Sequence, residues 1–327
     1  MPTKIEWARN ADGSQGETWN PLRVKAIDGK PNVSSSGHFG TGCTMVSPGC
    51  MHCYASHMNR RFYGNSYSYH SKPTEFFLDQ KILEMPLRRK KPTTWFVCSM
   101  CDLFHEDVPD DMIAKIYGVM WKCKHHTFQV LTKRPKRMEK LLRMIVDIDG
   151  LHWCTCSPLS GMYLPNVWLG VSAENQEMAN LRIPVLLTLP AVVRWVSFEP
   201  LLGPIDLLQC ERIDWAVVGG ESGPKARPMH PDWVRSLRDQ CLQSGVPFFF
   251  KQWGEHLPED QLCLPANRGE REEQLIDQFG RVPLWLGGDV HGLGHKGCFG
   301  NYYKVGKKAA GRTLDSIIYS QMPEVQG

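Results

Sequence analysis

The hydrophobic positions of the chain form short, nearly continuous runs that alternate with amphipathic stretches. Unbroken apolar runs are typical of parallel strands that are covered on both faces. The predicted strands are 93–100, 127–134, 166–173, 192–199, 214–221 and 246–253. The amphipathic stretches between them, 110–123, 136–148, 175–189 and 231–245, are predicted helices.

Repeated strand and helix units predict right-handed crossovers and therefore a parallel sheet. Their number favours an α/β fold with a full or partial parallel (β/α) barrel. Residues 10–40 are rich in Gly, Ser, Asn and Pro, which predicts a loop rather than a strand. Residues 149–165 resemble an insertion. We expect an N-terminal loop or lid segment (1–40), a barrel (41–254) and a C-terminal appendage packed on the barrel (255–327).

Polar residues follow the predicted strands at the point where each strand ends. The carboxyl ends of parallel strands converge on one face of a barrel, where binding and catalysis usually take place. One charged residue at such a position is usually a helix cap or part of a solvated loop. Several in succession predict a shared polar site, because burying them is costly unless they pair or bind a ligand. They are Asp102, Lys133, Arg134, Glu174, Asn175, Glu199, Glu221, Lys251 and Gln252.

Composition narrows the class of protein. Hydrophobic residues make up 42% of the chain, enough for a packed core, so we expect a folded protein. We find no run of 18 apolar residues that would span a membrane, and the N-terminal stretch MPTKIEWARN has no apolar signal region. We therefore expect a cytoplasmic protein with reduced thiols and no membrane partner. The net charge of +4 permits an anionic partner without requiring one.

Three cysteines lie within eleven residues in the stretch GCTMVSPGCMHCYASHMNRRF (42–62), which runs into a predicted helix. The C-x-x-C spacing lets Cys50 and Cys53 face one metal centre, and Cys43 adds a third thiol upstream. A closed zinc site takes four protein ligands, whereas three thiolates suit a 4Fe-4S cluster with one open iron. A zinc site completed by a distant residue, or thiols without a metal, stay open as alternatives.

The other cysteines fall into two groups. Cys98 and Cys101 repeat the C-x-x-C spacing, and Cys154 with Cys156 lies in the insertion. These four are candidates for a second metal site, although thiols from two segments are more often independent. The remaining cysteines are interpreted as isolated thiols, the first four in or near the core: Cys123, Cys210, Cys241, Cys263 and Cys298.

Nine motifs occur in a characteristic order along the chain. They are WNPLRVKA, GHFGTGCTMVSPGCMHCYASHMNRRF, CSMCDLFHEDVPDDMI, TFQVLTKRPKRM, PNVWLGVSAENQ, RIPVLLTLPAVVRWVSFEPLLGPID, DWAVVGGESGPKARPMHPDWVRSLRDQC, VPFFFKQWGE and VGKKAAGRTLD. With these motifs the chain resembles a phage-associated family of uncharacterised proteins that is similar to radical S-adenosylmethionine enzymes. The resemblance covers residues 4–255 and 304–315.

The resemblance implies a radical-SAM-type barrel, a 4Fe-4S cluster on Cys43, Cys50 and Cys53, and S-adenosylmethionine as cofactor. The usual superfamily spacing is C-x3-C-x2-C, whereas six residues separate Cys43 from Cys50 here. The longer loop is acceptable because the geometry at the cluster is the constraint. By the same analogy His52 lies over the adenine and Tyr54 lies near the cluster.

Strand ends supply further candidates for holding cofactor and substrate. Ser99 and Asp102 suit the amino-acid part of the cofactor. The GGES stretch at 219–222 lies on a late strand, so we do not give it the role of the superfamily's Gly-Gly-Glu motif. The remaining cofactor candidates are Lys133, Ser172, Asn175 and Glu199, and the substrate candidates are Glu221, Lys251, Gln252 and Trp253, the last as a stacking surface.

The implied function is to generate a 5′-deoxyadenosyl radical and to modify or isomerise a hypermodified DNA pyrimidine, in the host cytoplasm if the chain is phage-encoded. DNA or a modified nucleotide and a reductant for the cluster are the expected partners. Basic stretches at 60–62, 87–92 and 133–137 are candidates for phosphate contacts, although such clusters are usually solvated faces. Two alternatives are a metal-stabilised nucleic-acid-binding module without catalysis and a barrel hydrolase with structural cysteines.

Overall fold

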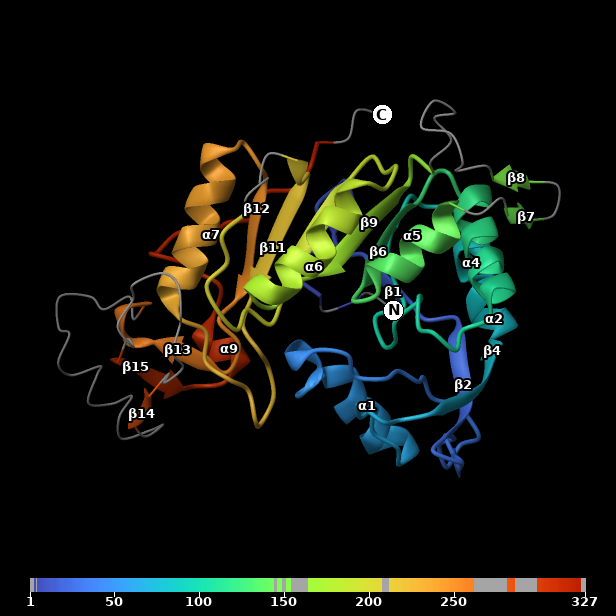
Figure 1. The fold of residues 1–327 in the computed structure, drawn as a ribbon, viewed down its shortest axis with the longest axis horizontal. Helices are drawn as coiled ribbons and strands as arrows, with labels where there is room; N and C mark the ends of the chain where they lie inside the picture. Colours follow the sequence, from blue (N-terminus) through green and yellow to red (C-terminus); the bar gives the residue numbers. More distant parts are fainter. Residues whose placement is uncertain are drawn as a thin grey trace.

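A seven-stranded parallel sheet forms the centre of the molecule and curls into a half-barrel (Figure 1). This computed structural model describes residues 3, 5–143, 146–148, 151–153, 164–207, 212–261, 281–285 and 299–324. In sheet order the strands are β1 (Glu17–Trp19), β5 (Thr94–Val97), β6 (Thr127–Thr132), β9 (Val167–Ser172), β10 (Arg194–Phe198), β11 (Trp215–Gly219) and β12 (Phe248–Gln252). The six predicted strands and the partial parallel barrel are therefore confirmed.

Helices from the strand connections cover one face of this sheet (Figure 1). They are α4 (Asp110–Lys122), α5 (Pro135–Arg143), α6 (Gln176–Leu187) and α7 (Pro231–Gln243). Four predicted helices are thus present. The one predicted at 136–148 ends earlier, and β7 (Val146–Ile148) then pairs antiparallel with β8 (Leu151–Trp153).

Side chains alternate between two hydrophobic clusters on the two faces of the sheet. On the face away from the helices, Trp195 packs against Trp7 with ring centroids 4.9 Å apart, and against Trp215 at 5.5 Å. Trp168, Trp195 and Trp215 stand near the starts of their strands. The tryptophan cluster therefore fills the half-barrel at the amino ends of the strands and leaves the carboxyl ends open.

The N-terminal segment is not the loop or lid that its composition predicts. β1 forms the edge of the central sheet and pairs with β5, and its Trp19 is buried. β2 (Leu22–Ile27) pairs antiparallel with β3 (Lys30–Pro31) and β4 (Pro73–Leu78). The expectation was wrong because the turn-forming residues are concentrated in the connections, while β1 and β2 bury apolar side chains such as Leu22 and Val24.

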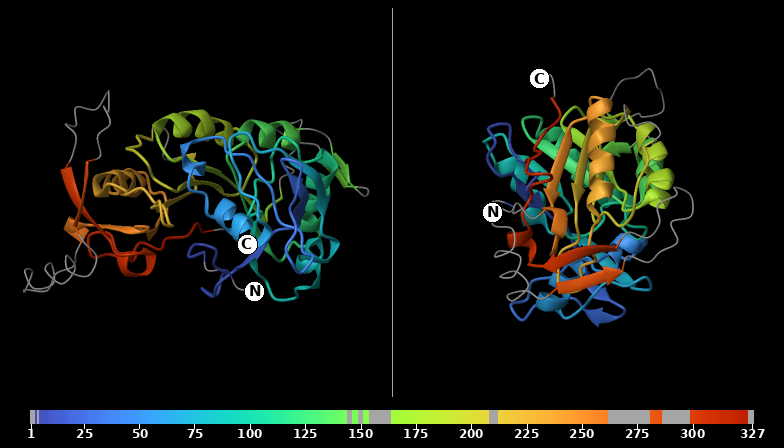
Figure 2. Two further views of the ribbon diagram at one scale, coloured as in Figure 1. Left: turned by 90° about the horizontal axis from the view of Figure 1, so that it is seen from below. Right: turned by 90° about the vertical axis from the view of Figure 1, so that its left-hand side faces the viewer.

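The chain beyond β12 forms a small antiparallel sheet to one side of the half-barrel (Figure 2). It contains β13 (His256–Pro258), β15 (Phe299–Lys304) and β14 (Arg281–Trp285). The last described segment returns to the core, where Ser320 bridges Phe249 of β12. The remaining elements are η1 (Pro48–Cys50), α1 (Tyr54–Tyr63), α2 (Gln80–Leu83), α3 (Met85–Arg88), η3 (Glu259–Gln261) and α9 (Lys307–Ala310).

A membrane span is not found in the part of the chain that the structure describes, because none of its helices combines the necessary length and apolar character.

Gly170→Ala is expected to destabilise the fold. A Cβ at this position in β9 would lie 2.4 Å from the ring of the buried Trp195, so the ring or the strand would have to move. Overpacking a core costs about 1–3 kcal/mol, which should lower the urea midpoint. Gly203→Ala is the control, since its Cβ would meet only Asn175 at 3.8 Å. Equal stability of the two variants would contradict this account of the tryptophan cluster.

Candidate functional site

A cavity of 420 Å³ lies at the carboxyl ends of the strands. Trp7, Phe96 and Leu131 form an apolar part of its lining next to the tryptophan cluster. The structure also brings most of the sequence-predicted residues to this cavity. They are Cys43, Cys50, His52, Cys53, Tyr54, Ser99, Asp102, Lys133, Ser172, Glu199, Glu221, Lys251 and Gln252.

Two of the predicted cofactor and substrate residues do not line the cavity. Asn175 caps α6, where its Oδ1 accepts a hydrogen bond from the Met178 N–H at 3.0 Å. Trp253 is 1% exposed, packs edge-on against Phe250, and donates from Nε1 to the Thr313 carbonyl oxygen at 2.8 Å. Trp253 is therefore a core residue and offers no stacking surface. A position after a strand does not reveal which side of the backbone faces the cavity.

One short turn places two of the three clustered thiols. The Cys53 N–H donates to the Cys50 carbonyl oxygen at 3.1 Å, and Cys53 is the N-cap residue of α1. Cys43 lies at the other end of the loop, and all three are free thiols on the cavity wall. We call residues 43–53 the cysteine loop.

The three thiols of this loop are the type of ligand that iron-sulfur clusters use. Among the residues that the structure describes, no three His, Cys, Asp or Glu side chains gather closely enough to share a single metal ion. The thiolates of a cubane cluster bind different irons and therefore stand farther apart than the ligands of one ion. Three thiols of one loop that line one cavity are compatible with that wider arrangement.

The other cysteines are only partly placed. Cys98 and Cys101 line the same cavity, and the hydrogen bond with the neighbouring Cys98 thiol, together with burial, raises the pKa of Cys101. Cys123 and Cys241 are buried in the main core, as expected. Five cysteines lie outside the described residues, so a second metal site stays a prediction: Cys154, Cys156, Cys210, Cys263 and Cys298.

Glu174, which follows β9, holds the middle of the cysteine loop. Its fully buried carboxylate accepts a hydrogen bond from the Gly49 N–H at 2.9 Å and pairs with Arg182 at 3.0 Å. Burial opposes ionisation, but Arg182 and Lys133 outweigh it and hold the pKa of Glu174 below its ordinary value. A Cβ on Gly49 would lie 2.9 Å from this carboxyl group, so glycine is needed for the close approach.

A second contact with the loop comes from the segment after β11. Arg227 donates to the Pro48 carbonyl oxygen at 3.0 Å, and its guanidinium also forms an ion pair with the buried carboxylate of Glu221. Glu221 is thereby committed to Arg227 as well as lining the cavity. Arg134, which follows β6, makes a third contact, with the first residues of the loop. Residues that follow three different strands, β6, β9 and β11, therefore bind the cysteine loop.

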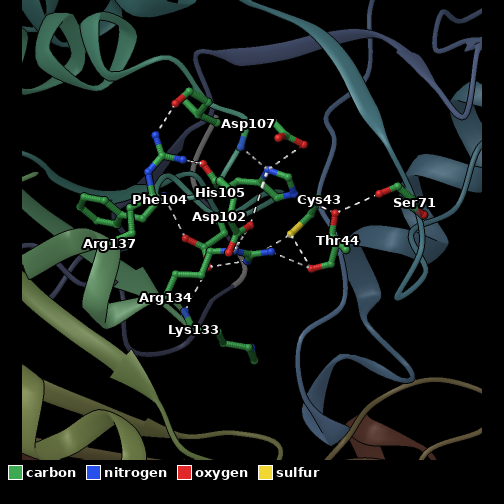
Figure 3. Close-up of polar contacts among 12 residues, drawn as sticks. Cys43, Thr44, Ser71, Asp102, Phe104, His105, Asp107, Lys133, Arg134 and Arg137 are labelled. Carbon is green, nitrogen blue, oxygen red and sulfur yellow. Dashed lines mark hydrogen bonds and ion pairs between the residues drawn. The ribbon is translucent and has the colours of Figure 1, made fainter. Parts of the chain in front are cut away.

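Asp102 anchors the cavity wall (Figure 3). Its oxygens accept hydrogen bonds from the Phe104 N–H, the Thr132 hydroxyl, the Lys133 N–H and Arg134, at 2.7–3.1 Å. Burial raises its pKa, yet Arg134 and these donors together hold the pKa below the ordinary value. Its proposed contact with the cofactor has to compete with four protein donors.

The polar groups nearest to a ligand would come from four strand ends, those of β6, β9, β10 and β12. The Lys133 ammonium donates to the Ser172 hydroxyl at 3.4 Å. Burial lowers the pKa of Lys133, but the neighbouring Cys50 and Glu174 reverse this and raise it, so the cation is retained. Lys251 forms an ion pair with Glu199. The buried Oε1 of Gln252 has no hydrogen-bond partner among the described residues.

Sequence reasoning missed the residues that support the site. Arg134 and Glu174 were recognised at strand ends but not selected, whereas Arg182 and Arg227 carried no signal, since nothing local marks an arginine as a partner of a distant loop. The expectation of a basic patch at 133–137 is corrected. Lys133 lines the cavity, Arg134 is buried, and Arg137 pairs with Asp110.

Glu174→Gln is expected to lower the stability at neutral pH, because it leaves Arg182 buried without its anion. Removing one partner of a buried pair costs about 3–5 kcal/mol. We expect a value near the lower end of this range, because the side-chain amide of the glutamine keeps part of the hydrogen bonding. The pKa of Glu174 lies below its ordinary value of 4.5, so the stabilisation is present above pH 4.5 and is lost as the pH falls through the folded-state pKa.

Urea unfolding at a series of pH values would measure this effect. The difference between wild type and Glu174→Gln should shrink in acid. Glu177→Gln, at an exposed position in α6, the helix that carries Arg182, is the control. A difference that stays constant with pH would contradict the assignment.

The comparisons with known proteins identify a family without stating a function. Residues 38–323 match the family described as "Protein of unknown function (DUF5131)". No curated protein and no solved structure matches the chain. The matched range contains the cysteine loop and every strand of the half-barrel except β1. Since the match covers most of its length, the chain belongs to the DUF5131 family.

Proposed function

We propose that the protein is a radical S-adenosylmethionine enzyme whose Cys43, Cys50 and Cys53 hold a 4Fe-4S cluster with one open iron. The observation that carries the proposal is that three thiols of one loop line a cavity at the carboxyl ends of a curled parallel sheet. A partial barrel of radical-SAM type is the corresponding proposal for the fold. The substrate class we propose is a hypermodified pyrimidine of DNA, which is modified or isomerised.

The side chains of the cavity are suited to orienting a cofactor and a substrate. When bound, the cluster and S-adenosylmethionine supply the electron and the 5′-deoxyadenosyl radical; the protein supplies orientation and excludes water. Lys133 offers a cation for a carboxylate, and the free acceptor of Gln252 can receive an N–H donor. The apolar wall at Trp7 and Phe96 keeps water from that side.

The hydrolase alternative is less well supported. Every carboxylate among the described lining residues is paired with a cation, and a paired carboxylate is a poor general base. The pairs are Glu6 with Lys307, Asp102 with Arg134, Glu199 with Lys251 and Glu221 with Arg227. A zinc-stabilised binding module stays open, since it also uses clustered cysteines.

A nucleic-acid substrate is supported by the surface next to the cysteine loop. Residues 29–74 contain no Asp or Glu. Helix α1 lies by the carboxyl ends of the strands (Figure 1). It exposes Tyr54, Met58 and Phe62 at four-residue intervals. Arg60 and Arg61 are exposed on the same helix. Aromatic and basic side chains together are the features that bind single strands.

The first test is release of 5′-deoxyadenosine from S-adenosylmethionine by anaerobically reconstituted, reduced protein. Cys50→Ala is expected to reduce release to background, because it removes a cluster ligand. Cys123→Ala, which removes a buried thiol outside the cavity, should leave release unchanged. A chain that binds only zinc and releases nothing would instead favour the binding module.

The second test concerns the surface of α1. Arg60→Gln combined with Arg61→Gln should weaken binding of a single-stranded pyrimidine oligonucleotide and reduce the slope of log affinity against log salt by about 1.4, or 0.7 for each lost phosphate contact. Fluorescence anisotropy would measure both. Lys115→Gln with Lys140→Gln, exposed on α4 and α5, removes the same charge elsewhere. Equal weakening by both pairs would refute a specific role for α1.

A further inference from the structure

The position of Cys43 is not determined by its own stretch of chain. A single turn holds Cys50 and Cys53, but six residues separate Cys43 from that turn. The chain path alone therefore leaves the Cys43 sulfur free to lie at different distances from the other two. A contact from another part of the fold is needed to place the third thiol.

Arg134 makes this contact (Figure 3). Its side chain is 5% exposed. Nη1 donates to the Cys43 sulfur at 3.9 Å, and Nη2 donates to the Thr44 carbonyl oxygen at 3.0 Å. Because the guanidinium is planar and rigid, these two donors fix the sulfur and the adjacent backbone together.

Two carboxylates prevent the guanidinium from turning away. Nη1 also donates to Asp102 at 3.1 Å, and Nε donates to the two oxygens of Glu106 at 2.8 and 2.7 Å. Asp102 is itself held by Thr132 and Lys133. The position of the Cys43 sulfur is thus fixed by contacts from the end of β6 rather than by the neighbouring residues of the loop.

We propose that Arg134 is the positioning residue that makes Cys43 the third ligand of the cluster, and that its charge sets the reduction potential of the cluster. This inference rests on the proposed function. Charge and hydrogen bonds to the sulfurs are known determinants of cluster potentials. A cation stabilises the more negative, reduced state. Its removal also leaves Asp102 as an unpaired anion nearby, which shifts the potential in the same negative direction.

The test compares wild type with Arg134→Gln and Arg134→Lys after anaerobic reconstitution. Iron and sulfide per chain, the rate of iron loss to a chelator and the midpoint potential are measured. Arg137→Gln is the matched control, because Arg137 lies three residues further along, in α5, and binds the His105 carbonyl and Asp110 without contacting the cysteine loop.

Arg134→Gln is expected to weaken iron retention about 10- to 100-fold, as the loss of a group that orients a metal ligand does. Its potential should move to a more negative value. Arg134→Lys keeps the charge but loses the planar guanidinium with its paired donors. The rate of iron loss should therefore be intermediate and the potential close to that of wild type. Arg137→Gln should match wild type in all three measurements.

The possible failures are distinguishable. A wild-type chain that takes up no iron would overturn the proposed function and this inference with it. Wild-type iron retention and potential in Arg134→Gln would overturn the inference alone. Weaker retention with an unchanged potential would reduce Arg134 to a structural role and refute the claim about charge. If Arg134→Gln does not melt cooperatively, Arg134→Lys is the deciding variant. Iron retention by Arg134→Lys equal to that of wild type would then contradict positioning by the guanidinium.

Discussion

Buried ion pairs at the strand ends hold the cysteine loop against the sheet, and the candidate site depends on them. Glu174, paired with Arg182, accepts a hydrogen bond from the Gly49 N–H. Arg134, paired with Asp102, donates to the Thr44 carbonyl oxygen at the start of the loop. Such pairs add little net stability, because desolvation of the charges offsets their attraction. Their value is geometric: each charge has one satisfactory arrangement, and the loop is part of it.

The half-barrel provides both a filled end and an open end. Buried tryptophans near the strand starts pack against one another, whereas small polar residues such as Ser172 and Ser197 stand near the strand ends and border the cavity. Gly170 makes room for the ring of Trp195 in this packing. A change from large to small side chains along the same strands therefore separates the stabilising region from the binding region.

Sequence reasoning identified most of the elements and most of the cavity lining. Buried parallel strands produce long apolar runs, and strand ends converge by topology, so Ser172, Glu199 and Lys251 were recognisable without coordinates. The failures have a common cause. Trp253 and Asn175 follow strands, as the correctly predicted residues do, but their side chains do not face the cavity: Trp253 packs in the core and Asn175 caps α6. The sequence does not show which side of the backbone faces the cavity. The strands of the N-terminal segment were missed because they are short and interrupted by turns.

The sequence by itself determined the parallel α/β architecture and the cysteine spacing, because both are expressed in local periodicity and in short-range motifs. Only the tertiary structure decided that Arg134 reaches Cys43, that Arg227 reaches Pro48 and that Glu174 reaches Gly49. Residues 91, 179 and 125 positions apart meet in these contacts. No local pattern encodes such pairings, since they exist only after the sheet has curled and brought the ends of its strands together.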